Sequence, residues 1–262
     1  MSDDGRVRWE REGSIAVVVL DRPHKLNSIT FSMSEQLFEI IAQVNRDDDI
    51  RVVVVSGAGD RAFSVGSDVS SLDHYGTNWQ MRNRADYGND YIDAMKACRK
   101  PMIAEIDGYA YGGGLEIACV ADLRIATPES SFAASEIRLG WHAGSGQTQY
   151  LPRLMGYGNA LRMLLTGRPI SAADALHQGL VQEVVERDRL RATTREIAND
   201  IAENAPIAVQ LTKHLVRNGM NLPIQTALAW ENDLFAYVMK TADSEEGQRA
   251  FSERRKARFE GR

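Results

Sequence analysis

Two short apolar runs frame the first sixty residues of the chain. Residues 15–20 and 52–55 consist of Ile, Val, Leu and Ala, which is typical of strands buried on both faces of a sheet. Between them, apolar side chains recur at helical spacing, at Met33, Leu37, Ile40, Ile41 and Val44. Ser32 with Glu35 fits a capping box, and Thr30 is an alternative cap. A strand, a helix and a second strand in this order predict a crossover unit and therefore a parallel sheet.

The alternation of strands and helices continues to about residue 185. Further strands are predicted at 101–106, 122–126, 131–134 and 180–185, and helices at 87–99 and within 147–178. Beyond residue 187 the pattern is helical throughout, and Pro206 and Pro223 stand at predicted helix starts. This helical tail carries more apolar side chains than a peripheral tail needs. Core packing explains part of that surface, and a subunit interface explains it more fully.

A glycine-rich turn joins the strand at 101–106 to the helix predicted after it. The sequence from Gly108 to Glu116 contains three consecutive glycines, Gly112 to Gly114, which suit a close approach of backbone to a ligand. A strand, a glycine turn and a helix N-terminus direct free N–H groups at one point, which makes an anion site. The anion is a phosphate or the charge that develops on a carbonyl oxygen during reaction. The turn lacks the signatures of a P-loop and of a dinucleotide site, and a plain tight connection is the remaining alternative.

Two glutamates accompany this turn. Glu116 stands in the first helical turn, and Glu136 follows the strand predicted at 131–134. A strand that returns beside the glycine helix would bring both carboxylates into one pocket. Two carboxylates around one water divide the roles of base and acid when their environments separate their pKa values. Two ordinary surface glutamates are the alternative, because the chain holds 36 acidic residues.

Composition excludes several classes of function. The 262 residues carry a net charge of −5 and a pI of about 5.6, which argues against nucleic acid as the main partner. The polar, acidic N-terminus does not resemble a secretory signal, and no apolar run approaches the roughly 20 residues of a membrane span. Cys98 and Cys119, the two cysteines, lack metal-ligand spacing and indicate a reducing compartment. We therefore expect a cytoplasmic protein with no membrane segment and no metal site.

Taken in order, the motifs resemble those of the enoyl-CoA hydratase/isomerase (crotonase) superfamily over nearly the whole chain. The sequence FSVGSD at 63–68 is similar to the family's F-x-A-G-x-D loop. DGYAYGGGLE at 107–116 is similar to its N-G-x-A-x-G-G-G-x-E, and 132–140 resembles F-x-x-P-E-x-x-L-G. Residues 165–181 match L-T-G and A-x-x-A-x-x-x-G-L-V. Each motif alone is weak, but their order is specific.

The resemblance implies an α/β fold, a crotonase-like spiral of ββα turns, over residues 1–195. It also implies a C-terminal helical region at 196–262 that assembles the chain into a homotrimer or hexamer. The substrate it implies is an acyl-CoA thioester. Coenzyme A is then part of the substrate, and no further cofactor is needed.

The resemblance also implies the catalytic groups. The oxyanion hole maps onto the backbone N–H groups of Val65 and Gly113. Family members that hydrate a 2-enoyl-CoA to a 3-hydroxyacyl-CoA in fatty acid metabolism have two glutamates, matched here by Glu116 and Glu136. In this hypothesis Glu116 activates water for attack on C3, and Glu136 protonates C2. The remaining predicted substrate-binding residues are Ser64, Gly66, Ser67, Asp68, Trp141, His142 and Gly144.

The chain departs from the family pattern beside the second glutamate. Ser135 replaces the usual proline, and Trp141 and His142 replace smaller or apolar residues. His142 is either a structural histidine or an additional acid, base or acyl-recognition group. These departures favour a substrate other than a plain short acyl chain.

Coenzyme A contacts are predicted at two basic residues. Lys25, or its neighbour Arg22, is a candidate for a CoA phosphate, and Arg254 is a candidate for the CoA of a neighbouring subunit. An ordinary solvated charge is the alternative for Lys25 and Arg22. The polar stretch at 62–78 is predicted to be a loop over the pocket.

Other functions stay open at this point. The same framework suits double-bond isomerisation, C–C bond hydrolysis or dehalogenation of a thioester. A catalytically inactive acyl-CoA-binding member, or one that also binds RNA, is a further alternative, although the acidic pI opposes RNA. A serine hydrolase is a poor alternative because no G-x-S-x-G surrounds Ser67 or Ser145.

Overall fold

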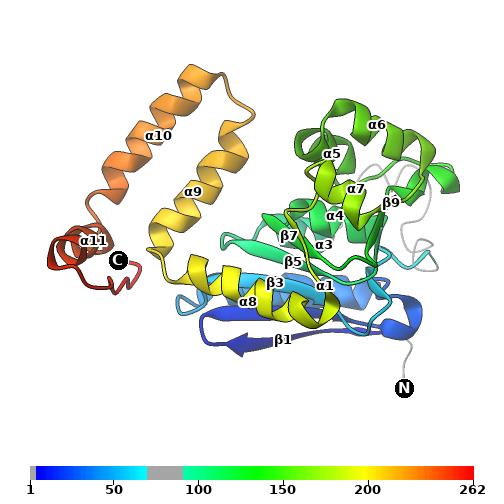
Figure 1. Ribbon diagram of the computed structural model, residues 1–262, viewed down its shortest axis with the longest axis horizontal. Helices are drawn as coiled ribbons and strands as arrows, with labels where there is room; N and C mark the ends of the chain where they lie inside the picture. The colour runs from blue at the N-terminus through cyan, green and yellow to red at the C-terminus, as the bar shows by residue number, and fades with distance from the viewer. Residues whose placement is uncertain (1–3, 70–90) are drawn as a thin grey trace.

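A six-stranded sheet forms the centre of the molecule (Figure 1). The computed structural model describes residues 4–69 and 91–262. The strand order is β1-β2-β3-β5-β7-β10, and every pairing is parallel except that of β1 with β2. The strands are β1 (Arg6–Glu12), β2 (Ile15–Asp21), β3 (Val52–Gly57), β5 (Met102–Ile106), β7 (Leu123–Ala126) and β10 (Glu183–Val184). The predicted parallel sheet is therefore confirmed, and β1 is an additional antiparallel edge strand.

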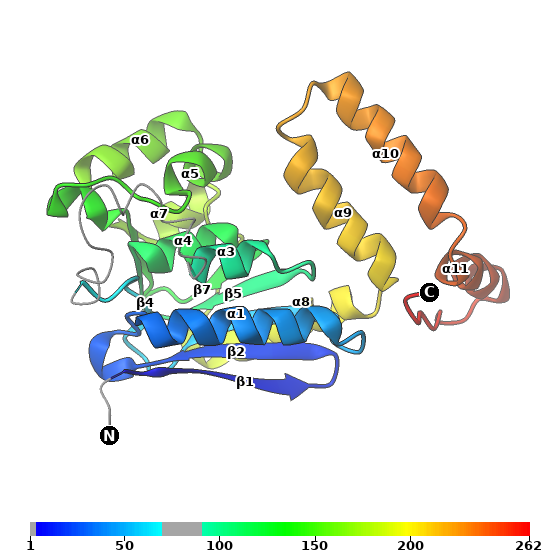
Figure 2. The ribbon, with the colours of Figure 1, turned by 180° about the vertical axis from the view of Figure 1, so that it is seen from behind.

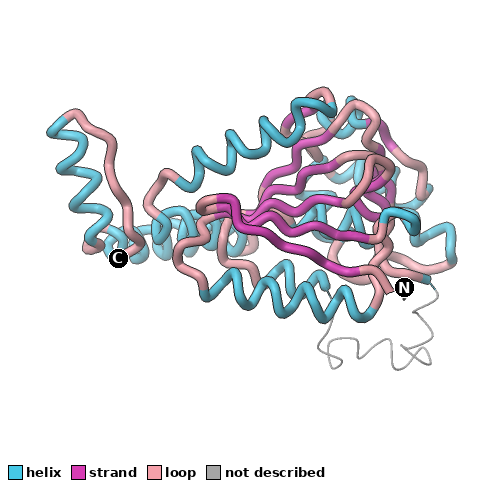
Figure 3. The backbone as a smooth tube through the Cα atoms, turned by 90° about the horizontal axis from the view of Figure 1, so that it is seen from below, coloured by secondary structure: helices cyan, strands magenta, loops and turns pink. Residues whose placement is uncertain are grey.

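Helices cover both faces of this sheet (Figure 3). Alternate strand residues face opposite ways: Val18 packs in the cluster that includes α1 (Phe31–Arg46), and Val17 packs in the cluster that includes α8 (Arg187–Ala202). Figure 2 shows α1 in front of the sheet, and Figure 1 shows α8 in front from the other side. The buried valine runs of the sequence are thus explained by burial on two faces.

Helix α1 begins two residues earlier than a cap at Ser32 would place it. The Thr30 hydroxyl oxygen accepts a hydrogen bond from the Met33 amide at 3.2 Å, so Thr30 is the N-cap. Ser32 lies inside the helix, where its hydroxyl oxygen accepts from Gln36 at 3.1 Å. The expected capping box of Ser32 and Glu35 is therefore wrong, and the alternative cap, Thr30, is correct.

A second, smaller sheet carries the chemistry-bearing segments. Its order is β4-β6-β8-β9, with β4 (Ala62–Ser64), β6 (Tyr109–Tyr111), β8 (Ser131–Ala133) and β9 (Ile170–Ser171). Strand β4 leads into the 63–68 loop, β6 leads into the glycine turn, and β8 leads into Glu136. Because β6 pairs in parallel with both β4 and β8, all three segments leave the same edge of this sheet.

Shorter helices complete the core around this edge. They are η1 (Pro23–Lys25), α3 (Tyr91–Lys96), α4 (Gly113–Val120), η4 (Ser135–Leu139), α5 (Gln147–Met155), α6 (Tyr157–Thr166) and α7 (Ala172–His177). Every residue of α4 is buried, so the helix that follows the glycine turn runs through the core. None of the described helices is long and apolar enough to cross a membrane.

Three helices form an arm that extends from the core (Figures 1 and 2). They are α9 (Pro206–Gly219), α10 (Ile224–Val238) and α11 (Ala242–Glu253). Pro206 occupies the first turn of α9, and Pro223 is the residue before α10, as predicted. No residue of α9 or α10 is buried. Helix α8, which runs across residue 195, still packs on the sheet through Leu190 and Ala198.

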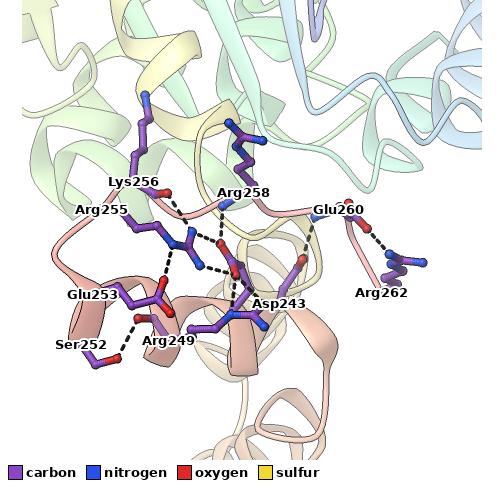
Figure 4. A network of polar contacts seen from close by, with 10 residues as sticks. Asp243, Arg249, Ser252, Glu253, Arg255, Lys256, Arg258, Glu260 and Arg262 are labelled. Carbon is purple, nitrogen blue, oxygen red and sulfur yellow. Dashed lines mark hydrogen bonds and ion pairs between the residues drawn. The ribbon is translucent and has the colours of Figure 1, made fainter.

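The C-terminal tail returns from α11 and is held by two buried carboxylates (Figure 4). Asp243 accepts from the amides of Glu260 and Gly261 at 2.7 and 2.8 Å. Hydrogen bonds from Arg255, from Arg249 and from the Arg258 amide hold the pKa of Glu246 well below its ordinary value. The tail also reaches the core, because the Arg51 guanidinium donates to the carbonyls of Ala202 and Phe259 at 2.9 and 2.5 Å.

Candidate active site

The N-terminus of α4 presents unused backbone donors. Gly112 has a φ of +52°, a conformation that favours glycine, and its amide donates to the Ala133 carbonyl at 3.0 Å. The Glu116 amide closes the first turn by donating to the Gly112 carbonyl at 3.1 Å. Within the described residues, the Gly113 amide makes no hydrogen bond. This is the geometry of an anion-binding helix terminus.

The 63–68 loop lies directly against this helix terminus. A Cβ on Gly66 would overlap the backbone nitrogen of Gly113, and a Cβ on Gly114 would overlap the carbonyl oxygen of Ser64. The Ser64 side chain is fully buried, donates to the Asn27 carbonyl at 2.8 Å and accepts from the Gly66 amide at 3.1 Å. Ser64 therefore shapes the loop from inside, whereas its predicted role was substrate contact.

The structure points to a different loop donor from the one expected. The Val65 amide already donates to the Leu26 carbonyl at 3.2 Å. Two residues on, Ser67 forms a parallel bridge with Ile29, in which Ile29 donates to Gly66 at 2.8 Å and Asp68 donates to Ile29 at 2.9 Å. In such a parallel bridge, the residue between the two bonded neighbours, here Ser67, directs its N–H away from Ile29. The Ser67 amide, which has no acceptor in the described parts of the chain, is thus the available donor.

Glu116 is buried in the first turn of α4. Its side chain is 4% exposed, and Oε1 accepts a hydrogen bond from the Ser145 amide at 2.7 Å. The loop before α5 therefore holds this carboxylate in place. Cys119, one turn further along, is not a competing nucleophile, because burial raises the pKa of its thiol to about 12.

Glu136 is the second residue of η4, the short helix that follows β8. Burial raises the pKa of its carboxyl, an effect opposed by hydrogen bonds from the backbone and from Gln147. Gln147 Nε2 donates to Glu136 Oε1 at 2.7 Å and to the Gly112 carbonyl at 2.8 Å. Gln147 therefore ties the second glutamate to the glycine turn that precedes the first. A pocket shared by Glu116 and Glu136 stays a prediction, and this link supports it.

Two residues of this site were not identified from the sequence. Gln147 lies in the segment that also carries Trp141 and His142, and its sequence position alone gives no sign of a role. Tyr91, the first residue of α3, is 3% exposed, and its hydroxyl lies 3.0 Å from the Ser67 hydroxyl. A Cβ on Gly113 would overlap that phenol oxygen, so Tyr91 lies over the helix terminus. Only tertiary structure brings an isolated tyrosine to this position.

The other residues predicted to bind the substrate lie in the loop before α5 and beside Arg22. Trp141, His142 and Gly144 are exposed in the loop before α5, and His142 Nδ1 lies 2.7 Å from the neighbouring Ala143 carbonyl. This contact fits a structural histidine, which is one of the alternatives for His142. Asp68 forms an ion pair of 2.6 Å with the buried guanidinium of Arg22.

The two candidate CoA contacts lie at opposite ends of the molecule. Lys25 is exposed on η1, near the 63–68 loop, whose Val65 amide bonds the next residue, Leu26. Arg254 caps α11 at the end of the arm, remote from α4 in both ribbon views (Figures 1 and 2). The predicted loop at 62–78 lies outside the described residues from position 70 onward.

A large cavity lies at the other end of α4, away from the glutamates. Its volume is about 1020 Å³, and its lining includes Val120, Leu154, Val209 and Phe259, from the core, the arm and the tail. Neither Glu116 nor Glu136 lines it. Within the described ranges, no group of three His, Cys, Asp or Glu side chains is arranged to hold a metal ion.

Comparison with known proteins identifies the family to which this fold belongs. Residues 10–262 match the family model described as enoyl-CoA hydratase/isomerase, and the chain belongs to that family. It is 38% identical to the short-chain-enoyl-CoA hydratase of Clostridium acetobutylicum over 94% of both chains. It is 40% identical to the (E)-benzylidenesuccinyl-CoA hydratase of Thauera aromatica over 97% of this chain and 99% of the relative.

Solved structures give the same result for the fold. The enoyl-CoA hydratase of Bacillus anthracis superposes with a TM-score of 0.91 at 35% identity, covering 98% of this chain and 99% of that one. The predicted crotonase-like α/β fold with a C-terminal helical region is confirmed. The predicted enzyme class is confirmed as well: the chain is an enzyme of the enoyl-CoA hydratase type.

Proposed function

We propose that this enzyme adds water across the double bond of a 2-enoyl-CoA thioester to give a 3-hydroxyacyl-CoA. The observation that carries the proposal is a pair of glutamates at one helix terminus, of which Glu116 is buried and Glu136 is half-buried. Glu116 lies in the first turn of α4, and Glu136 is linked to the residue before that helix through Gln147. The hydratases among the relatives support the same reaction.

The thioester oxygen is proposed to accept hydrogen bonds from the amides of Gly113 and Ser67. Both belong to backbone segments in van der Waals contact, as the missing Cβ of Gly66 requires. Ser67 takes the place first expected for Val65, because the Val65 amide is already bonded to Leu26. Loss of one such donor typically costs about 10²–10³ in rate, so these two amides dominate the stabilisation of the enolate.

The two carboxyls divide the proton transfers. Glu116, held by the Ser145 amide, accepts a proton from water as the water oxygen bonds to C3. The C2–C3 π electrons move into the thioester, and the enolate then takes a proton at C2 from Glu136. Burial raises the pKa of Glu136, which favours the protonated form that this step needs. One proton is gained by Glu116 and one is lost by Glu136, and exchange with solvent resets the pair. The thioester itself acidifies C2, so no further cofactor is required.

The names of two relatives indicate two candidate kinds of enoyl-CoA substrate. One is named for short-chain enoyl-CoA, and the other for an enoyl-CoA that carries a phenyl and a second carboxyl group. Trp141, which differs from the family pattern, supports a substituted acyl chain. We further propose that the protein acts in the cytoplasm as a homotrimer or hexamer, with Lys25 and Arg254 as CoA contacts.

Thioester hydration is the decisive measurement. The protein is mixed with crotonyl-CoA and, separately, with benzylidenesuccinyl-CoA, and the loss of the conjugated enoyl absorbance is followed. We expect turnover of at least one substrate, with a loss of at least about 100-fold in both Glu116→Gln and Glu136→Gln. An exposed control, Glu39→Gln, should retain full activity. Binding of both thioesters without any hydration would contradict the proposal and direct attention to isomerisation or thioester-activated cleavage.

A further inference from the structure

Gln147 occupies an unusual position for an uncharged side chain. It is the first residue of α5, and it is completely buried beside the carboxyl group of Glu136. Its Nε2 donates two hydrogen bonds, to the Gly112 carbonyl at 2.8 Å and to Glu136 Oε1 at 2.7 Å. The Gly112 carbonyl can only accept, so the amide group must present nitrogen on this side.

This arrangement determines which Glu136 oxygen carries a proton. An N–H already points at Oε1, so a proton on Oε1 would face another donor. The proton of the neutral acid therefore belongs on Oε2. Among the described residues, two buried side-chain polar atoms have no hydrogen-bond partner, and they are Glu136 Oε2 and Gln147 Oε1. Buried oxygens without partners are costly, which indicates that a bound molecule completes them.

We propose that Gln147 is a positioning residue for the reaction. Its Nε2 fixes the carboxyl of Glu136 against the glycine turn and leaves Oε2 as the oxygen that exchanges its proton with C2 of the substrate. Gln147 Oε1 is the acceptor for an O–H group of the water that adds, or of the 3-hydroxyl that results. This inference rests on the proposed hydration and assigns to Gln147 a task separate from that of either glutamate.

Among the described residues, the charges around Glu136 are few, so the effect of Gln147 can be isolated. Helix α4 contributes Glu116 and Cys119, and burial keeps the Cys119 thiol neutral. On the other neighbouring elements, Arg138 of η4 and Arg162 of α6 are exposed. Replacing Gln147 with an apolar residue of similar size leaves all of these groups in place. The hydrogen bond from Gln147 favours the ionised carboxylate, so its loss raises the pKa of Glu136 further.

The test compares Gln147→Met with a matched control, Gln149→Met, which changes an exposed glutamine in the same helical turn. In the enoyl-CoA hydration assay, we expect Gln147→Met to lower kcat about 10- to 100-fold and to change KM less than about threefold. Gln149→Met should match the wild type in both constants. A Gln147→Met enzyme with unchanged kcat, or one that loses only KM, would overturn the inference.

A second measurement needs no turnover and separates this inference from the proposed hydration. Protein labelled with ¹³C at the glutamate carboxyls is titrated by NMR, and the Glu136 signal is assigned by its absence in Glu136→Gln. We expect Gln147→Met to move the Glu136 titration to higher pH, while Gln149→Met leaves it unchanged. An unmoved titration would overturn the inference even if the enzyme hydrates enoyl-CoA. A moved titration in a protein that hydrates no enoyl-CoA would retain the positioning role and reject the hydration.

Discussion

At the scale of single residues, the burial of Glu136 sets function against stability. Desolvation raises the pKa of its carboxyl because the ionised form is poorly solvated in the folded protein. A native pKa above the unfolded one means that the folded state binds more protons between those two values. Stability contributed by this group is therefore present at low pH and decreases as pH rises above the unfolded pKa, about 4.3. At neutral pH the Glu136 carboxyl therefore lowers the free energy of unfolding.

Glu136→Gln should therefore stabilise the protein at neutral pH while it abolishes hydration. We expect the free energy of unfolding to rise by about 0.5–2 kcal/mol at pH 7, in the range typical of relieved active-site strain. At pH 4 the carboxyl is largely protonated in both states, and the gain should nearly vanish. Urea unfolding at both pH values measures this difference, with Glu39→Gln as the exposed control. An equal gain at pH 4 and pH 7 would show that desolvation of the carboxylate is not the cause.

The sequence indicates the ionisable groups of the candidate site but not the residues that support them. Glu116, Glu136 and Gly113 follow from a motif whose spacing is local. The choice between the Val65 and Ser67 amides depends on which carbonyls approach the loop, and Leu26 and Ile29 lie almost forty residues earlier. Such a pairing has no signature in the loop itself. The same reason applies to Gln147, which acquires its role only from its contacts.

At the scale of elements, α4 is held at both ends. At its N-terminus, Gly114 allows the backbone of Ser64 to approach the helix closely. At its C-terminus, the buried guanidinium of Arg124 donates to the carbonyls of Ala118 and Ala121 at 3.0 and 2.7 Å. Arg124 thereby satisfies terminal carbonyls and places a positive charge at the negative end of the helix dipole. The amide of Gly113 is consequently presented by a rigid helix.

Gly114→Ala should test the close contact between α4 and the 63–68 loop. The added methyl would overlap the Ser64 carbonyl, so the loop and the helix must separate. We expect a loss of about 1–3 kcal/mol in unfolding free energy, as for overpacked sites, and a fall in hydration of about 100-fold as the two amides move apart. Both are measured on the purified variant, by denaturant unfolding and by the enoyl-CoA assay.

The matched control is Gly158→Ala in α6, where an added Cβ meets no atom within 4 Å. Alanine favours a helix over glycine, so this change should stabilise the protein by about 0.5–1 kcal/mol and leave hydration unchanged. If Gly114→Ala behaved like Gly158→Ala, the contact would not be tight in solution.

The elements predicted best were those with one clear period. The valine runs of β2 and β3 and the stripe of α1 were identified because burial dictates their pattern. Strand β1 was missed because it is an edge strand whose charged side chains reach solvent, for example Arg8 and Glu10. Strand β6 is not predicted as a strand, because its three residues, Tyr-Ala-Tyr, are too few to show an alternating pattern beside the glycine turn.

At the scale of the whole molecule, the arm leaves apolar surface uncovered. Ile224, Leu228 and Phe235 on α10 are 67%, 46% and 63% exposed, and their spacing of four and eleven places them on one side of the helix. The sequence predicted this excess of apolar residues in the tail and attributed it to a subunit interface. It could not give the direction in which the arm extends, because that depends on how α9 leaves α8.

A double substitution on this stripe should separate assembly from folding. We expect the wild type to elute as a trimer or hexamer, because an apolar stripe of this kind is stable when another subunit covers it. Leu228→Glu with Phe235→Glu places two charges on the stripe and should shift the mass measured by light scattering after gel filtration to that of one chain.

Gln225→Glu, an exposed polar position of the same helix, should leave the mass unchanged. Circular dichroism of the double variant should retain the wild-type helix signal, since no residue of α10 is buried within its own chain. A wild type that remains monomeric at tens of micromolar would contradict the assembly, and the apolar stripe would then need another explanation.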